Sequence, residues 1–382
     1  MKKRMLALVL TLCIAMLSLV ACGTKEDDNK FYIGGIGPLT GENAVYGTHV
    51  KIAAEIAVKE INDAGGINGA MIEFRSEDDV SDPEKSVNAY NSLKDWGMQI
   101  LMGTVTSSPS VAVSEETYAD NMFMLTPSAS AAEVVKYDNA FQVCFTDPNQ
   151  GMASAQYIAN NQLADKVAII YNSSDVYSTG IYEKFIEEAK NYDFEIVSAE
   201  AFTSDSNTDF NVQLQKAKDN GAELLFLPIY YEAATLILTQ ADAMDFKPIF
   251  FGCDGLDGIL GVDNFDTSLA EGVMLLTPFA ADADDEKTQK FVEDFKAING
   301  DIPNQFGADA YDAIYIIKEA IEKSGVTPDM STSDIGDALT KVMTEISFDG
   351  LTGASMTWTA SGEVNKAPMA VVIKNGQYVS AE

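Results

Sequence analysis

The chain is 382 residues long, which suits two domains of ordinary size. Its 58 acidic and 25 basic residues give a formal net charge of −33, and such a surface repels nucleic acid and anionic lipid headgroups. The only histidine, His49, has no second histidine or cysteine near it, and we expect it on the surface of the first helix. The composition therefore argues against a nucleic-acid partner and against a zinc or other imidazole-rich metal site, and no cofactor is expected.

The N-terminus has the pattern of an export signal. Residues 2–4 are basic and precede an apolar run over 5–20, which is too short for a membrane span. The run ends at Cys22 in the sequence L-V-A-C, which resembles the lipobox of bacterial lipoproteins, where the cysteine is lipidated and becomes the mature N-terminus. We predict a signal peptide over 1–21, a lipidated tether over 22–30, and a protein held by lipid alone on the extracytoplasmic face of the bacterial cell membrane. The alternative is a plain secretory signal with a chance cysteine.

The cysteine and arginine counts limit what else the chain can do. Only Cys144 and Cys253 remain beyond Cys22, too few for a disulfide framework, and nothing in their spacing supports a bridge between them. Arg75 is the only arginine outside the leader, and it lies in a strand-like segment instead of a glycine- or serine-rich turn. Because phosphate, sulfate and second carboxylates usually recruit arginine, we expect weak or no binding of phosphate, sulfate or glutamate.

Short apolar strands alternate with amphipathic helices along most of the chain, which predicts an α/β protein with mostly parallel sheets. In the first half, strands are expected at 31–36, 71–76, 100–102, 122–125 and 141–145, with a helix that ends at Gly65-Gly66, a helix at 83–96 and a helix that begins near Ser107.

Asp147-Pro148 interrupts the pattern, and a second α/β series follows. Strands are expected at 167–171, 196–202, 224–228, 248–252 and 273–276, with helices at 150–160, 181–190, 210–220, 233–244, 286–298, 308–323 and 333–344. The end of the chain turns antiparallel, because segments 369–373 and 377–380 flank Asn375-Gly376, a strong hairpin signal.

These two series predict two Rossmann-like lobes with parallel central sheets. The first lobe is expected to comprise 31–146 with 280–348, and the second 147–279 with 349–382. The helices after residue 280 would return to the first lobe and the final hairpin to the second. The chain would then cross between the lobes three times, which makes a three-strand hinge.

Two turns in the stretch 100–130 form the candidate binding site. Small hydroxyl residues and free backbone N–H groups at the helix start near Ser107 suit an anion such as a carboxylate. The turn Thr126–Ser130 adds hydroxyls and carbonyls at the same sheet edge, where ligands of parallel sheets usually bind. The alternative is two ordinary serine-rich turns that cap helices. Neither turn holds a nucleophile with a base, and the chain has no G-x-S-x-G motif, so we predict a binding protein and not an enzyme.

Four segments together carry a family resemblance. They are G-P-L-T-G at 37–41, Tyr46-Gly47, I-N-D-A-G-G-I-N-G at 61–69 and T-P-S-A-S at 126–130. With the lipobox, they resemble the branched-chain amino-acid binding protein family, the extracytoplasmic receptors of ABC importers with the type I periplasmic-binding-protein fold. The resemblance covers the chain from about residue 31 to residue 378, and the I-N-x-x-G-G-I-N-G run is its most specific part.

The resemblance implies which residues bind the ionic groups of an amino acid. Ser107 matches a serine that binds the carboxylate, the backbone carbonyl of Ser128 matches an acceptor for the ammonium, and Ser130 matches a hydroxyl contributor. Tyr177 matches a tyrosine that closes over the ligand, and Asp254 matches the acid that pairs with the α-ammonium. The alternatives are a turn aspartate for Asp254 and a core aromatic for Tyr177.

The resemblance also implies a side-chain pocket lined by Tyr46, Tyr230 and Phe306, where aromatic walls suit an apolar side chain. A disulfide of some family members has no counterpart, since the matching positions are near Val80 and Thr106. The implied function is a monomeric substrate-binding component of an ABC importer, which delivers a branched-chain or other apolar amino acid to the permease and ATPase subunits. The alternative is an extracellular ligand sensor of the same fold that is not coupled to transport.

Overall fold

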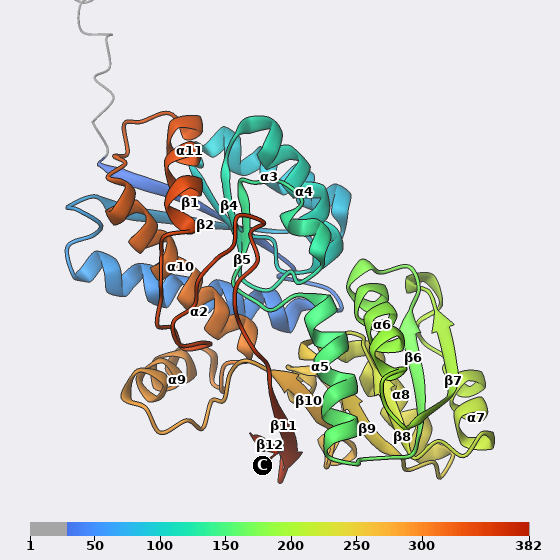
Figure 1. Ribbon diagram of the computed structural model, residues 1–382. Coiled ribbons are helices and arrows are strands. Elements are labelled where there is room, and N and C mark those ends of the chain that lie inside the picture. The colour runs from blue at the N-terminus through green and yellow to red at the C-terminus, as the bar shows by residue number, and fades with distance from the viewer. Residues whose placement is uncertain (1–28, 382) are drawn as a thin grey trace, which may run out of the picture.

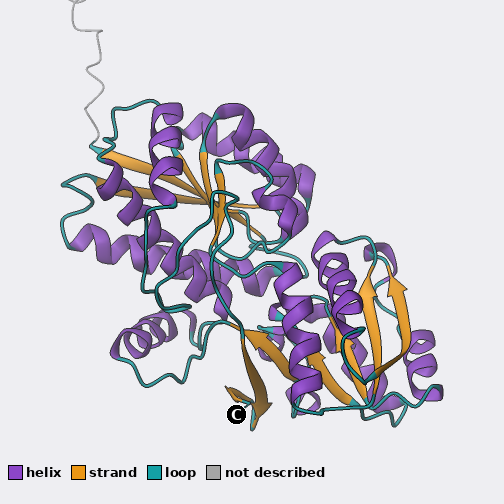
Figure 2. Ribbon diagram, in the orientation of Figure 1, coloured by secondary structure: helices purple, strands orange, loops and turns teal. Residues whose placement is uncertain are grey.

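The computed structural model describes residues 29–381, so the leader and Cys22 lie outside the described residues. The chain forms two α/β lobes, with one sheet in each (Figures 1 and 2). The predicted α/β fold with parallel sheets in two lobes is confirmed. Within the described part, none of the helices has the length and apolar character needed to cross a membrane.

The first lobe contains a five-stranded parallel sheet in the order β2-β1-β3-β4-β5. Its strands are β1 (Lys30–Gly37), β2 (Met71–Asp78), β3 (Ile100–Gly103), β4 (Phe123–Thr126) and β5 (Ala140–Gln142). Every residue of β3 and β4 is buried. These strands read as unbroken apolar runs because helices cover both faces of a parallel sheet.

Six helices belong to this lobe. They are α2 (Ala44–Asp63), α3 (Pro83–Trp96), α4 (Ser107–Asp120), α9 (Glu286–Asn299), α10 (Gln305–Ser324) and α11 (Thr332–Met343), with a short 3₁₀ turn η1 (Ala132–Val135). Local signals fix their ends: Asp82 caps α3 by accepting a hydrogen bond from the Lys85 N–H at 2.9 Å, and Gly97 ends it with a φ of 107°. α10 packs along α2, and the Tyr311 hydroxyl donates to Glu60 at 2.5 Å. The late helices therefore return to the first lobe.

The second lobe contains a seven-stranded sheet in the order β12-β11-β10-β9-β8-β6-β7. Its strands are β6 (Lys166–Asn172), β7 (Glu195–Phe202), β8 (Leu224–Leu227), β9 (Ile249–Gly252), β10 (Met274–Thr277), β11 (Met369–Lys374) and β12 (Gln377–Ser380). Its helices are α5 (Asp147–Asn160), α6 (Val176–Ala189), α7 (Asn211–Asp219) and α8 (Tyr231–Ala243), with 3₁₀ turns η2 (Ser204–Ser206), η3 (Asp254–Leu256), η4 (Ile259–Gly261) and η5 (Thr267–Ala270). The β11–β12 hairpin is antiparallel and pairs with β10.

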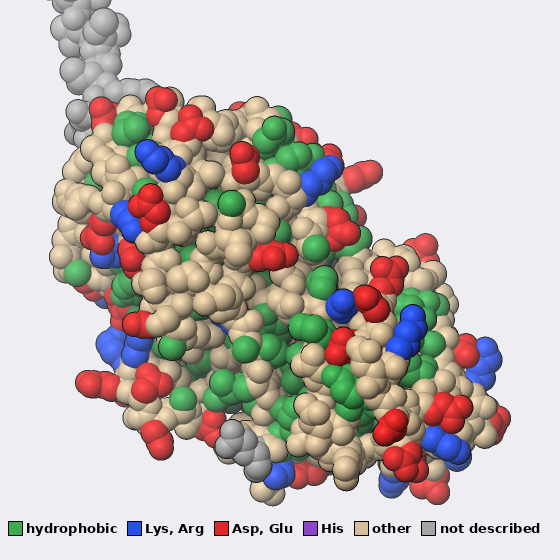
Figure 3. All heavy atoms as spheres, in the orientation of Figure 1, with side chains coloured by type: hydrophobic (Ala, Val, Ile, Leu, Met, Phe, Trp, Pro, Cys, Tyr) green, Lys and Arg blue, Asp and Glu red, His purple; other side chains and the backbone are tan. Residues whose placement is uncertain are grey.

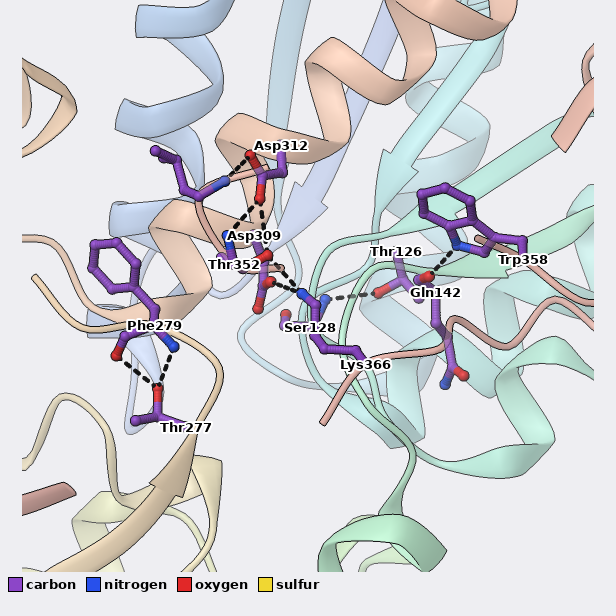
Figure 4. Close-up of polar contacts among 11 residues, drawn as sticks. Thr126, Ser128, Gln142, Thr277, Phe279, Asp309, Asp312, Thr352, Trp358 and Lys366 are labelled. Carbon is purple, nitrogen blue, oxygen red and sulfur yellow. Dashed lines mark hydrogen bonds and ion pairs between the residues drawn. The ribbon is translucent and has the colours of Figure 1, made fainter. Parts of the chain in front are cut away.

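One predicted boundary differs from the structure. Residues 349–366 were expected in the second lobe, but they lie against the first. The Leu351 N–H donates to Asp312 of α10 at 2.9 Å, and the Trp358 indole N–H donates to the Gln142 carbonyl at 2.7 Å (Figure 4). The crossing into the second lobe therefore follows Lys366. The reason is that backbone and side-chain groups of the first lobe supply hydrogen-bond partners of this irregular segment.

A buried ion pair lies at this crossing. The Lys366 ammonium donates to Asp309 of α10 at 2.8 Å and to the Thr352 hydroxyl at 2.6 Å, and both charged side chains are almost fully buried (Figure 4). A buried charge is costly unless it is paired, so the pair fixes the last crossing to α10.

Two other expectations are corrected or resolved. His49 is partly buried instead of lying on the surface: its ring packs 4.8 Å from that of Phe295, and its Nδ1 accepts from the Asn304 N–H at 3.1 Å. Burial lowers the pKa of His49 to about 4. Cys144 and Cys253 are buried free thiols, so no bridge joins them. On the face that Figure 3 shows, Asp and Glu side chains are scattered over both lobes, with Lys and Arg among them.

The buried pair gives a stability prediction. Lys366→Met should lower the free energy of unfolding by roughly 3–5 kcal/mol, because it leaves Asp309 buried without its cation. Adding Asp309→Leu should recover most of the loss, since a buried pair replaced on both sides is often nearly neutral. Chemical denaturation measures both. Lys59→Met, which removes an exposed pair with Asp63, is the control and should change the midpoint little. Equal destabilisation by Lys366→Met and Lys59→Met would contradict the prediction.

Candidate ligand-binding site

The first-lobe half of the site is built from the turns that follow β3 and β4. Ser107 begins α4, and Ser128 and Ser130 follow β4; all three are buried. The Ser107 hydroxyl accepts from the Ser130 N–H at 3.3 Å and from the Ala131 N–H at 3.2 Å. The Ser128 hydroxyl donates to the Val105 carbonyl at 2.8 Å. The two turns are thus joined into one polar floor at the N-terminus of α4, where the helix dipole favours a negative group.

The second-lobe half consists of Tyr177 in the first turn of α6 and Asp254 in η3, directly after β9. The Tyr177 hydroxyl donates to Asp254 Oδ1 at 2.8 Å and accepts from the Gly255 N–H at 2.9 Å. The other carboxylate oxygen, Asp254 Oδ2, is buried and has no hydrogen-bond partner among the described residues. Burial raises the pKa of Asp254 to about 7. The carboxylate is held by one oxygen, and the other is left for a hydrogen-bond donor.

Two polar residues at the start of α5 connect the halves. The Asp147 N–H donates to the Ser130 carbonyl at 2.9 Å, and Gln150 Oε1 accepts from the Asp254 N–H at 3.2 Å. Gln150 Nε2 lies 3.4 Å from Asp147 Oδ1, so a continuous path of hydrogen bonds runs from the first-lobe turn to Asp254. In the sequence, Asp147-Pro148 is visible only as a break in the pattern. The carboxyl of Asp147 and the amide of Gln150, both in the first turn of this helix, were the only local sign that the segment could belong to the site.

The aromatic residues predicted to line the side-chain pocket lie together. The Tyr46 ring is 4.2 Å from that of Phe306 and 5.8 Å from that of Tyr230, and Tyr230 stacks on Tyr177 at 4.6 Å. Tyr46 also has a second role, because its hydroxyl donates to the Gly255 carbonyl and accepts from the Tyr231 N–H at 3.3 Å.

Tyr231, which sequence analysis did not select, completes this contact between the lobes. Its hydroxyl accepts from the Val45 N–H at 3.1 Å, and its ring meets that of Tyr46 at 4.7 Å with the rings nearly perpendicular. The N-terminal turns of α2 and α8 are therefore joined by reciprocal hydrogen bonds, and the lobes are in contact above the site.

A cavity of about 560 Å³ lies between loops of both lobes, and Tyr230 is the one predicted site residue in its wall. Its wall includes Asn43, Ser81 and Thr106 from the first lobe and Asn172, Asp175 and Tyr230 from the second. The Ser108 hydroxyl donates to Asp175 at 3.1 Å across the gap. Within residues 29–381, no three or more His, Cys, Asp or Glu side chains are grouped to hold a metal ion.

The comparison with known families decides the identity. A family model described as periplasmic binding protein matches residues 30–377. The chain belongs to this family, in its branched-chain amino-acid binding branch. A periplasmic binding protein of this kind binds a substrate without transforming it, so the chain is not an enzyme.

Curated relatives of this periplasmic binding protein match most of its length. Leu/Ile/Val-binding protein homolog 3 of Brucella melitensis is 30% identical over 306 residues, with 78% of this chain and 80% of the relative covered. The leucine-, isoleucine-, valine-, threonine- and alanine-binding protein of Pseudomonas aeruginosa is 29% identical over 291 residues, with 76% and 77% covered.

Solved structures give the same fold. The branched-chain amino acid transporter substrate-binding protein LivJ of Streptococcus pneumoniae, in complex with isoleucine, superposes with a TM-score of 0.84 at 27% identity and covers 92% of this chain and 99% of its own. The leucine-binding protein LivK of Thermotoga maritima has a TM-score of 0.82 at 24% identity, covering 92% and 98%. The predicted type I periplasmic-binding-protein fold is confirmed.

The buried carboxyls give a pH prediction for the protein with its lobes in contact. Burial raises the pKa values of Asp254 and Asp257 to about 7, against about 3.9 in an unfolded chain. Between these values the folded state binds more protons, so stability should fall as pH rises from about 5.5 to 7 and level off above. Melting curves at pH 5.5, 7 and 8 test this, and Asp254→Asn should reduce the slope. A melting temperature that rises from pH 5.5 to 8 would contradict it.

Proposed function

We propose that this chain is the extracytoplasmic substrate-binding component of an ABC importer, and that it binds a free amino acid between its lobes. The side chain of that amino acid is branched-chain or otherwise apolar. The relatives that bind leucine, isoleucine, valine and related amino acids support this choice. The observation that carries it is the buried, unpartnered Oδ2 of Asp254. An ammonium group supplies the donors that this oxygen lacks.

The opposite charge of an amino acid has a complementary place. Ser107 and the N-terminus of α4 lie on the other lobe, and the hydrogen-bond path through Asp147 and Gln150 places this turn close to Asp254. A carboxylate there would accept hydrogen bonds from the Ser107 hydroxyl, the Ser130 hydroxyl and helix-start N–H groups, and the Ser128 carbonyl would accept from the ammonium. Both ionic groups of a zwitterion are then matched, one by each lobe.

The rest of the cleft suits an uncharged side chain. Tyr46, Tyr230 and Phe306 supply aromatic surface. Arg75, the only arginine of the described chain, lies on the outer strand β2. It forms a salt bridge with Glu77, and its guanidinium lies over the ring of Trp96. With no guanidinium to read a second anionic group, glutamate, phosphate and sulfate are poor candidates.

In this mechanism, ligand binding brings the two lobes together. The lobes hinge at the three crossings, Asp254 and Tyr177 move onto an amino acid held by the first lobe, and the closed form delivers it to the permease and ATPase subunits. Lipid on Cys22 would keep the protein, as a monomer, at the extracytoplasmic membrane face. An extracellular sensor of the same fold is the alternative. Loss of ligand uptake when the gene is deleted would favour transport over sensing.

Substitution of Asp254 tests the amino-acid site. Asp254→Ala should weaken binding by about 30-fold to several thousand-fold, because the ligand ammonium stays buried without a partner. Asp254→Asn should lose less, since its amide oxygen still accepts a hydrogen bond. Titration calorimetry with leucine, isoleucine, valine and alanine measures both variants.

The exposed Asp205 provides a control, and Asp205→Ala should bind as the wild type does. Unchanged affinity in Asp254→Ala would remove Asp254 from the site. Equal wild-type affinity for the matching 2-hydroxy acid would show that no ammonium is recognised.

Substitution of Cys22 tests the anchor. Cys22→Ser removes the thiol that a lipobox requires, so the protein should appear in the medium or remain as an uncleaved precursor. Cell fractionation with mass spectrometry of the N-terminus distinguishes these forms from the lipidated one. Processing at residue 22 and detergent partitioning like those of the wild type would show that the protein is not a lipoprotein.

A further inference from the structure

Gln305 is a buried glutamine whose side chain has no partner. It is fully buried in the first turn of α10, and both Nε2 and Oε1 lack hydrogen bonds among the described residues. Gln99, in the same lobe, shows the usual arrangement: its Oε1 accepts from the Tyr32 N–H at 3.2 Å and its Nε2 donates to the Pro328 carbonyl at 2.8 Å. Leaving a buried donor and acceptor both unpaired is costly, so Gln305 calls for an explanation.

The contacts of its backbone place Gln305 beside the ligand site. Its N–H donates to Asp257 Oδ2 at 2.7 Å, and the Asp257 N–H in turn donates to the Asp254 carbonyl at 2.8 Å. The next residue, Phe306, belongs to the aromatic cluster around Tyr46. Gln305 thus lies between the acidic turn of the second lobe and the predicted side-chain pocket.

Helix geometry adds a second unpaired group on the same face. Asp309 follows Gln305 by four residues, so the two side chains lie on one face of α10. Its Oδ1 accepts from Lys366, but its Oδ2 is buried without a partner among the described residues. Asp254 of the second lobe is buried in the same way and also has one carboxylate oxygen, Oδ2, without a partner among the described residues. Buried polar atoms are therefore left unpaired both on the start of α10 and in the second-lobe turn that α10 contacts.

An amide with both atoms free complements a group that donates and accepts at one atom, and a hydroxyl does so. A wholly aliphatic ligand would leave the amide unpaired in the closed cleft. We propose that Gln305 is a specificity-determining residue of the amino-acid site, which selects a branched side chain bearing a hydroxyl over its aliphatic isostere. Threonine over valine is the matched case: the methyl group meets the Tyr46 and Phe306 rings, and the hydroxyl pairs with the Gln305 amide. The inference rests on the proposed amino-acid function, and it departs from a purely apolar ligand in one respect, because the favoured branched side chain carries a hydroxyl.

The test is the ratio of threonine to valine affinity, measured by calorimetry on the full mature protein. The wild type should bind threonine at least about 10-fold more tightly than valine, the effect of leaving one buried polar group unpaired. Gln305→Leu should bring the ratio to about one or reverse it, and Gln305→Met is the second variant in case leucine does not fit. Melting curves should show no loss of stability in either, because no hydrogen bond is removed.

Gln99→Leu is the matched control, since it removes a buried glutamine of the same lobe away from the cleft. It should lower the melting temperature and leave the ratio unchanged. A wild type that prefers valine, or a ratio unchanged in both Gln305 variants, overturns the inference. Only this inference fails if amino acids bind and Asp254→Ala abolishes binding, but the ratio of threonine to valine affinity is unchanged by substitution of Gln305. If no amino acid binds the wild type, the proposed function fails with it.

Discussion

The unpaired oxygen of Asp254 is the constraint on which the site depends. A carboxylate taken out of water is costly unless donors replace its hydration. Tyr177 supplies one donor, burial raises the pKa of the group to about 7, and Oδ2 remains without a partner in the described chain. A cation between the lobes removes this cost only when both lobes enclose it. Under the proposed function, binding and closure would then be one event.

Helix α10 contacts both the second-lobe turn that carries Asp254 and the last crossing between the lobes. At its start, Gln305 contacts the acidic turn of the second lobe and Phe306 joins the aromatic cluster. One turn later Asp309 is paired with Lys366, at the point where the chain crosses to the second lobe for the last time. A helix cannot change the spacing of these side chains independently, so a shift of the second-lobe turn against Gln305 is transmitted to the buried pair. The ligand site and the last crossing share one rigid element.

Much of this architecture is visible in the sequence because it rests on local physics. Apolar runs such as those of β3 and β4 mark strands buried on both faces, and Gly97 and Asp82 mark helix ends. The family motifs carried the fold and pointed to Ser107, Ser130, Tyr177 and Asp254, and the structure brings the last two into hydrogen-bond contact. Asp147, Gln150 and Gln305 carry only a weak signal, because an acid or amide at a helix start is ordinary until its partners are known, and Tyr231 carries none.

The sequence by itself determined the α/β class, the order of the elements, the two-lobe plan and the family. These follow from periodicity, capping and motifs, which act over a few residues. Only the tertiary structure decided that segment 349–366 lies on the first lobe, that His49 is partly buried, and that polar atoms of Asp254 and Gln305 are left unpaired together. Those facts depend on which groups meet across long sequence separations. Burial and hydrogen-bond satisfaction are properties of the assembled chain, and no local pattern encodes them.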